Sequence, residues 1–315
     1  MSIPAGTVNT FTTIGNREDL TDMIYRIDPV DTPFINGVDK TTATAIKHEW
    51  QTQALATAAS NAQLEGDDVT ADTATVTVRL SNTAQISRKV PFVSGSQQAV
   101  DHAGRDDEMA YQEMLKGLEL KRDMEVVVTA NQAQVTGDTT TARKLSTVLS
   151  WIKSASDKGA SGADPGTSGT NSRSDGTQRA FTEAQLKGVL STIWTNGGKP
   201  DTIMVGAFNK QQFSTFTGRS SPIEQASSKK IVAAVDAYES DFGRLKVVAN
   251  SFSRSRDCLV LQMDMWAIAY LKGRRMVSVP IAPTGDARKK LILSEYTLES
   301  RNEKASGIVA DLTTS

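Results

Sequence analysis

The sequence has one cysteine, two histidines and few aromatic residues, which make up 6% of the chain. Cys258 alone cannot form an intramolecular disulfide, so a disulfide-stapled secreted scaffold is excluded. No run of about eighteen apolar residues occurs, and the first residues lack a basic segment followed by an apolar one. We therefore expect neither a membrane-spanning helix nor a signal peptide, but a soluble protein made inside the cell.

An excess of charge of one sign is also missing. The chain carries 35 Lys and Arg residues against 36 Asp and Glu residues, which gives a formal net charge of −1. General nucleic-acid binders and membrane-surface proteins carry a basic excess, so neither role is favoured for the protein as a whole.

Patterns for catalysis or metal binding are not found either. His48 and His102 have no ligand-spaced neighbour, and Cys258 lies in an apolar segment without an evident histidine partner. Asp241-Phe242-Gly243 matches a kinase magnesium-binding triplet, but without the other kinase motifs it predicts a turn between strands. Gly197-Gly198-Lys199 lacks the first glycine of a phosphate loop and indicates a helix end. The sequence thus predicts no catalytic, cofactor-binding or metal-binding residue and no enzyme activity.

What the chain does have is length, since 315 residues and 33.9 kDa suffice for substantial hydrophobic cores. Its first 43 residues are rich in Thr, Asn and Asp, contain three prolines, and have a helical pattern only at 20–27. Such a segment cannot form a core of its own. We interpret it as an arm that lies on another part of an assembly, with a frayed terminus as the alternative.

Residues 44–92 have the alternating pattern of an extended β-hairpin. Its returning strand, 76–90, would reach about 50 Å. The segment 53–73 between the strands has few large apolar residues and carries Glu65, Asp67, Asp68 and Asp72. An isolated hairpin is marginally stable and has open edges, so we expect it to need a partner surface, in this chain or in a neighbouring subunit. Cation binding by the acidic cluster is a weaker alternative, because its spacing does not match an EF-hand loop.

A long helix is predicted over about 101–131, with a length of about 45 Å. A break at Gly117 is the alternative, and Lys121 and Glu125 are placed to form an i,i+4 ion pair. The glycine-rich segment 154–178 that follows is predicted to be a mobile surface loop.

The remainder alternates helix and strand and predicts an α+β unit with a mixed sheet. Thr182 and Gln185 form a capping box for a helix that ends at Asn196-Gly197. A short helix is expected near 209–216, capped by Asn209. The expected strands lie at 202–206, 231–236, 245–249, 259–263, 266–271, 291–298 and 308–312.

Six stretches of the sequence form a set that is specific when taken together and in order. They are Asp31–Phe34, Ile193–Gly198, Met204–Lys210, Tyr238–Asn250, Glu295–Ala305 and Gly307–Asp311. This set resembles the major capsid proteins of tailed bacteriophages, particularly the podophage-type group without a fused scaffold, and it spans almost the whole chain.

The resemblance implies an α+β fold of the Hong Kong ninety-seven type, also called the Johnson fold. Its parts would be an N-terminal arm (1–43), an extended loop (44–92), a peripheral domain with the spine helix (93–139 and 274–315), and an axial domain (140–273) that contains the glycine-rich loop 154–178. The residues that we predict to act in assembly are Phe34, Trp50, Glu65, Asp67, Asp68 and Arg79.

The implied function is a major capsid protein that assembles into hexamers and pentamers and forms the icosahedral head shell around double-stranded DNA. Implied partners are further copies of the chain, a separate scaffolding protein, a portal protein, a decoration protein and non-specifically contacted DNA, but no membrane and no cofactor. The protein would be assembled in the host bacterial cytoplasm and reside in the virion. Two alternatives are a related compartment shell that encloses cargo enzymes and, less favoured, a cytosolic enzyme built on residues 181–273.

Overall fold

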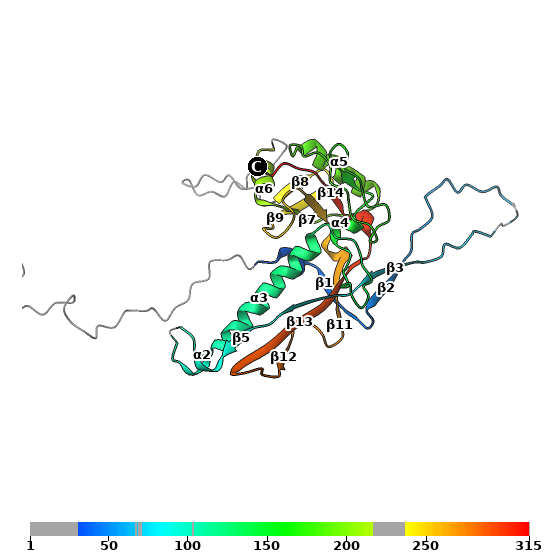
Figure 1. Cartoon of the computed structure of the whole chain (residues 1–315). Coiled ribbons are helices and arrows are strands. Elements are labelled where there is room, and N and C mark those ends of the chain that lie inside the picture. Colours follow the sequence, from blue (N-terminus) through cyan, green and yellow to red (C-terminus); the bar gives the residue numbers. More distant parts are fainter. Residues whose placement is uncertain (1–30, 67, 69–70, 103, 217–236, 315) are drawn as a thin grey trace, which may run out of the picture.

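The structure, a computed structural model, describes residues 31–66, 68, 71–102, 104–216 and 237–314. Figure 1 shows an elongated lower body that contains the long helix α3 (Glu108–Thr129) and a rounded upper body that contains α5 (Glu183–Thr195). A loop that follows β2 (Lys47–Thr52) and returns through β3 (Val78–Thr83) projects to one side. Each body is built on its own sheet.

The sheet of the lower body is organised around one long strand, β13 (Ala287–Ser300). One edge of β13 pairs with β11 and β12, and the opposite edge pairs with β4 and β5. On the outer side of β11, β1 pairs with it in parallel. The bounds of these strands are β1 Asp39–Ala43, β4 Gln85–Lys89, β5 Phe92–Ser94, β11 Trp266–Leu271 and β12 Val277–Ile281.

The sheet of the upper body is mixed, as predicted, with the order β6-β14-β10-β7-β9-β8. Its strands are β6 Ser156–Asp157, β7 Thr202–Val205, β8 Ala237–Ser240, β9 Gly243–Ala249, β10 Cys258–Leu261 and β14 Gly307–Val309. Helix α5 packs Leu186, Val189, Leu190 and Ile193 into the core of this sheet. The Thr182–Gln185 capping box is present, and Gly197 ends the helix with φ +81°, as expected.

Five shorter helices and 3-10 turns connect these elements. They are α1 Pro33–Gly37, α2 Gly95–Ala99, α4 Val148–Trp151, η1 Met263–Met265 and η2 Glu303–Ala305. A further helix, α6 (Ala207–Phe213), begins after Gly206 and not at Asn209. The prediction that Asn209 caps this helix is wrong, because its side chain is buried and donates to the carbonyl of Ser255. Asp241-Phe242-Gly243 forms the predicted turn between β8 and β9.

Helix α3 is continuous through Gly117, so the alternative of a break at this residue is wrong. Its 22 residues span about 33 Å, less than expected, because Asp107 caps the helix by accepting from the amide of Ala110 (3.0 Å). The predicted ion pair between Lys121 and Glu125 is not formed. Both side chains contact α1 instead, Lys121 through Asn36 and Glu125 through the amides of Phe34 and Ile35.

The extended hairpin is shorter than predicted. Only six residues of each strand, β2 and β3, form a two-stranded ribbon. After Ala84 the returning chain leaves β2 and pairs with β13 as β4 and β5, so residues 85–94 belong to the lower sheet. Residues 53–64 and 71–77 form neither helix nor strand.

The glycine-rich segment 154–178 is packed against the upper body, and the prediction of a mobile surface loop is wrong. The amide of Gly169 donates to the carbonyl of Ser150 (2.7 Å), and β6 pairs with β14. A Cβ atom at Gly169 would lie 2.5 Å from the Trp151 ring, and the φ of Gly169 is +76°. The glycines therefore permit close approach of the backbone rather than mobility.

The start of the described chain is also integrated into the fold. Phe34, Ile35 and Val38 are buried in the main core together with residues of α3, β11 and β13. The predicted arm, 1–43, is therefore not without a core at α1, which packs into the core of this chain, whereas β1 pairs with β11 and is buried only at Ala43. Residues 1–30 of the predicted arm lie outside the described residues. The predicted helix at 20–27 and strand at 231–236 lie outside the described residues.

The two sheets divide the chain differently from the predicted domain boundaries. Strand β11, expected in the axial part 140–273, belongs to the lower sheet. Strand β14, expected in the peripheral part 274–315, belongs to the upper sheet, where it pairs with β10. The two sheets thus exchange one strand each across residue 273, and the domain bounds stay a prediction.

Candidate assembly surfaces

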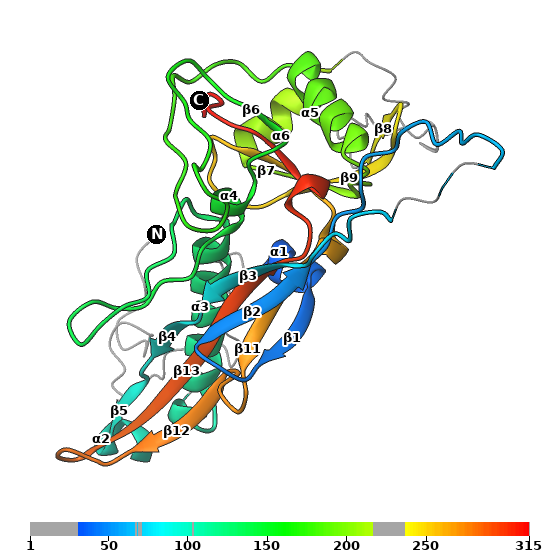
Figure 2. The same ribbon diagram turned by 90° about the vertical axis from the view of Figure 1, so that its right-hand side faces the viewer.

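A loop, residues 53–77, projects from the body (Figures 1 and 2) and carries the most exposed large apolar side chains among the described residues. Leu55 is 95% exposed, and Leu64 and Val76 are each 79% exposed. Burying an exposed side chain of this size contributes about 2 kcal/mol, so the loop gains free energy if a second surface covers it. The loop also carries four acidic residues and no Lys or Arg.

The base of the loop is held firmly against the lower body. The Trp50 indole nitrogen donates to the carbonyl of Ser300 (2.8 Å), and its ring lies 5.4 Å from that of Trp151. On the same strand His48 lies 3.2 Å from Glu299 and holds the pKa of that carboxyl below its usual value. The loop therefore leaves the subunit from a fixed ribbon.

Asn82 fixes the other strand of this ribbon from inside the fold. Its buried carboxamide donates to the carbonyls of Ser146 (3.0 Å) and Leu298 (2.7 Å) and accepts from the amide of Ser146 (2.9 Å). The same oxygen also accepts from the amide of Thr83 (2.8 Å), so four bonds use the full hydrogen-bonding capacity of the carboxamide. Sequence reasoning missed Asn82, because an asparagine within a strand pattern has no local signal for such a role.

The predicted assembly residues fall into two groups. Glu65, Asp68 and Arg79 are exposed. The Nε of Arg79 donates a hydrogen bond to Glu49 on the neighbouring strand of the ribbon (2.8 Å). Asp67 lies outside the described residues. Phe34 is fully buried and packs edge-to-face on Trp266, with ring centroids 6.5 Å apart.

Trp50 is half-buried and packs against the same core as Phe34, so these two residues form the second group. The structure does not bring the two groups together. Phe34 and Trp50 pack within this subunit, whereas Glu65, Asp68 and Arg79 lie at its surface.

A second surface lies on the lower sheet, on the face opposite α3. Lys89 and Lys290 form ion pairs with Asp123 and Glu113 of α3, so they mark the covered face. Because side chains alternate along a strand, their neighbours in sequence point to the other face. Figure 2 shows that α3 lies behind this sheet and that the lower part of the front face is not covered by a helix.

This open face, as we call it, is apolar with a basic component. The strand register places its members in three rows across the sheet: Val277, Leu293 and Arg88; Val279 and Leu291; Ile281, Lys289 and Phe92. Arg88, Phe92, Val279 and Ile281 are exposed, whereas Leu293 is buried and the other three are half-buried. The Lys289 ammonium lies 4.9 Å from the centre of the Phe92 ring. An exposed apolar sheet face with positive charge is suited to an apolar, acidic partner.

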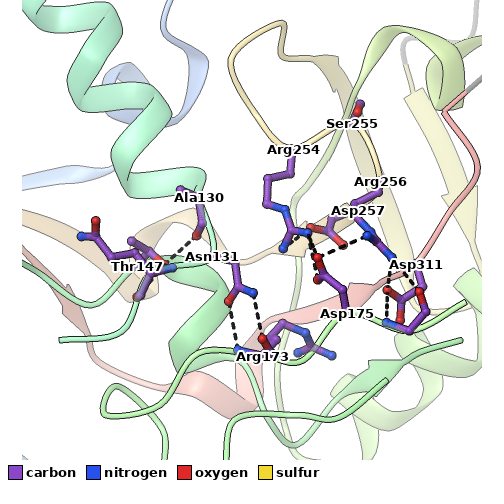
Figure 3. Close-up of polar contacts among 12 residues, drawn as sticks. Ala130, Asn131, Thr147, Arg173, Asp175, Arg254, Ser255, Arg256, Asp257 and Asp311 are labelled. Atoms are coloured by element: carbon purple, nitrogen blue, oxygen red, sulfur yellow. Dashed lines mark hydrogen bonds and ion pairs between the residues drawn. The ribbon is translucent and has the colours of Figure 1, made fainter. Parts of the chain in front are cut away.

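A third feature is an ionic cluster that holds the glycine-rich segment in place (Figure 3). Arg254 donates twice to Asp175 (2.7 and 2.9 Å). Arg256 donates to the carboxylate of Asp311 (2.7 Å), which also accepts from the amides of Gly159 (3.1 Å) and Gly176 (2.8 Å). The cluster connects the approach to β10, the glycine-rich segment and the C-terminal segment.

Asp257, in the same cluster, is buried 3.4 Å from Arg254, and burial raises its pKa to about 6, partly offset by Arg254. The native state therefore holds this proton more tightly than the unfolded chain does. Protonated Asp257 contributes fully to the free energy of unfolding below about pH 4, and this contribution is lost as the pH rises through about 6. The free energy of unfolding is therefore about 2–3 kcal/mol lower above this range than below it.

Asp257→Asn is expected to make the protein more stable than the wild type at pH 8, by about 2 kcal/mol, because desolvation of the ionised carboxylate outweighs its attraction to Arg254, which keeps its bonds to Asp175. The difference should shrink to near zero at pH 4. Urea unfolding between pH 4 and pH 8 measures it, with Asp241→Asn at an exposed turn as the matched control. A variant that is less stable than the wild type at pH 8 would contradict this assignment.

Neither a metal site nor a membrane helix is found in the parts that the structure describes. Within residues 31–66, 68, 71–102, 104–216 and 237–314, no three His, Cys, Asp or Glu side chains are grouped so that they could hold a metal ion. The helices of these segments are too short or too polar to cross a bilayer. Cys258 is buried in β10, and burial raises the pKa of its thiol.

Comparison with known proteins gives consistent matches along the whole chain. Residues 6–313 match the family model described as SU10 major capsid protein. The major capsid protein of Escherichia phage Phieco32 is 26% identical over 332 aligned residues, with 94% of each chain covered.

Solved structures match as well. The cyanophage A-1(L) capsid asymmetric unit is 12% identical, with 95% of this chain and 98% of that chain covered and a TM-score of 0.64. A chain of Gordonia phage Cozz is 10% identical, with coverages of 95% and 92% and a TM-score of 0.63. At these identities the structural matches establish the fold alone.

Proposed function

The chain belongs to the SU10 major capsid protein family, and from this premise we propose that it assembles into hexamers and pentamers, which close into the icosahedral head shell around double-stranded DNA. It is a structural protein of the phage virion and not an enzyme. The observation that carries the assembly mechanism is the projecting loop 53–77, in which this chain leaves Leu55, Leu64 and Val76 exposed.

In this mechanism the loop of one subunit lies on the open face of its neighbour. The two surfaces are complementary, since the loop has four acidic residues and exposed Leu55 and Leu64, whereas the open face has Arg88, Lys289 and an apolar centre. Each leg of the loop has about twelve residues and reaches about 40 Å when extended, far enough to lie across an adjacent subunit. Such head-to-tail contacts close into rings.

The proposed partners follow from the same role. A separate scaffolding protein, a portal protein and a decoration protein would act with the shell, which would assemble in the host bacterial cytoplasm. The near-neutral net charge of −1 suits a container that contacts its DNA weakly and without sequence preference.

Electron microscopy of the purified protein, alone and with its scaffolding protein, tests the proposal. We expect capsomers and closed shells. A protein that stays monomeric under both conditions would overturn it. Nuclease-protected double-stranded DNA in native particles would distinguish a phage head from a compartment that encloses cargo enzymes.

Val279→Glu is expected to reduce shell yield at least tenfold, because it places a negative charge on the open face where the acidic loop would lie. Val279→Lys, the matched control, removes the same apolar side chain but keeps the charge complementary, so its yield should stay near that of the wild type. Both should melt within about 2 °C of the wild type, since Val279 is exposed on β12. Shell yield is measured by sedimentation, and equal yields from the two variants would exclude this face.

A further inference from the structure

Glu125 is a buried carboxylate that is held by neutral donors. Its side chain is 0% exposed and lies near the C-terminal end of α3. It accepts hydrogen bonds from the amides of Phe34 (2.8 Å) and Ile35 (2.9 Å) and from the Asn250 side chain (2.7 Å). Within the described residues no Lys or Arg forms an ion pair with it. Burial of a carboxylate without a cationic partner costs folding free energy. The arrangement of the three groups that bind Glu125 therefore needs an explanation.

The first two bonds join α3 to α1. Phe34 and Ile35 lie in the first turn of α1, where backbone amides have no acceptor within the helix. One turn earlier on α3, Lys121 donates to the Asn36 side chain (2.8 Å), toward the other end of α1. The negative group thus lies at the start of α1 and the positive group near its end, which is the favourable arrangement for the helix dipole.

The third bond joins both helices to the upper sheet. Asn250 directly follows β9, and its amide donates to the carbonyl of Val205 at the end of β7 (2.9 Å). Its side-chain oxygen accepts from the amide of Phe252 (2.9 Å). One carboxylate therefore contacts three parts of the subunit: the segment 31–38, the long helix and the end of the upper sheet.

Apolar contacts alone would not fix the orientation of α1 on α3 in the same way. Phe34, Ile35 and Val38 are buried in the main core, but burial of apolar area is non-directional and tolerates rotation of a one-turn helix. Three directed bonds to one carboxylate leave α1 a single orientation on α3. That orientation fixes the position of segment 31–38 on the long helix.

We propose that Glu125 is an internal latch, a positioning residue that fixes segment 31–38 and the end of β9 on α3 and so gives the free subunit the shape that shell assembly requires. The proposal rests on the shell-forming function above. It concerns the subunit before assembly, and it assigns Glu125 to positioning rather than to overall stability.

Glu125→Gln tests the latch. In the wild type the Phe34 amide donates to Oε1 of Glu125 and the Ile35 amide donates to Oε2. In glutamine one of these two positions is an NH2 group, which faces another donor and cannot accept from it. We expect hydrogen exchange at the amides of Phe34 and Ile35 to be about 10- to 100-fold faster. The melting temperature should be unchanged or higher, because a buried charge is removed. Shell yield should fall several-fold at temperatures where the variant is fully folded.

The matched control is Glu119→Gln, which neutralises a half-buried carboxylate on the same helix that pairs with Lys116. It should change neither exchange at Phe34 and Ile35 nor shell yield. Asn250→Ala should loosen the 250–253 segment while leaving most of the α1 protection.

Unchanged amide exchange in Glu125→Gln, or faster exchange with a normal shell yield, would overturn the latch. Equal losses of global stability and of local protection would overturn it as well, since they indicate a purely structural residue. If wild-type protein forms no shells, the proposed function fails, while the exchange measurement still decides whether Glu125 positions α1.

Discussion

Deletion of residues 53–73 is expected to leave a folded subunit that forms no shells. The deletion removes the acidic residues and two of the three most exposed apolar residues of the loop, and it retains β2 and β3. Thr52 pairs with Val78, so residues 74–77 become a four-residue hairpin connection that preserves the register. Because every described residue of the removed segment is exposed, its loss should change the melting temperature by no more than about 2 °C.

The physical reason for the assembly defect is the loss of one partner of a repeated contact. Every subunit would contribute one loop and one open face, so each intersubunit contact of this kind is removed at once. Sedimentation and electron microscopy measure the result. Normal shells from the deleted protein would eliminate the loop from the mechanism.

A length-preserving variant serves as the control for the deletion. Replacement of the four loop acids by their amides, at Glu65, Asp67, Asp68 and Asp72, keeps the reach of the loop and removes its charge. We expect slower assembly that depends less on salt, with shells still formed, because electrostatic complementarity mainly affects the association rate. A complete loss of shells in this variant would place the binding energy in the charges rather than in the apolar contacts.

Asp311→Ala is expected to lower the free energy of unfolding by about 3–5 kcal/mol, the largest single-residue effect that the structure predicts. The carboxylate accepts from Arg256 and from the amides of Gly159 and Gly176, and all of these lose their acceptor together. The backbone of Asp311 has φ +61°, a conformation that alanine adopts less readily than aspartate does. Urea unfolding at pH 7 measures the change.

Asp311→Asn separates the contributions to this effect. Asparagine tolerates positive φ and keeps an acceptor oxygen, but it lacks the charge that pairs with Arg256. We expect a loss of about 1–2 kcal/mol. Proteolysis should detect the consequence directly, since the glycine-rich segment 154–178 should be cut more rapidly in the alanine variant than in the asparagine variant. Equal stability of Asp311→Ala and the wild type would contradict the anchoring role of this carboxylate.

Local patterns predicted many of the elements correctly. The alternation of apolar and polar residues at 291–298 predicts a strand, and β13 confirms it. The capping box at Thr182 and Gln185 marks the start of α5 correctly. The α+β capsid fold implied by the resemblance is confirmed by the matches to solved phage capsids. These signals succeed because they depend on neighbours within one or two turns of the chain.

Predictions that depended on distant partners failed. Lys121 and Glu125 have the spacing of an ion pair, yet each binds α1, which lies about 90 residues away in sequence. The composition of 154–178 indicates mobility, but the segment is anchored by Asp311, Arg254 and Arg256. In the assembly set, Phe34 turned out to be a core residue because α1 packs onto Trp266.

The sequence by itself determined the class of protein, the main helices and strands, and the lack of any recognisable catalytic motif. The class of protein was implied by the resemblance of six stretches of the sequence to a known family, whereas the helices, the strands and the lack of a motif follow from composition and short-range periodicity. Only the tertiary structure decided which exposed surfaces exist and which charges are internal. The reason is that a charged or glycine-rich segment has the same local pattern whether water or a distant part of the chain satisfies its polar groups, and the packing of α1, the glycine-rich segment and the C-terminal segment settles that choice.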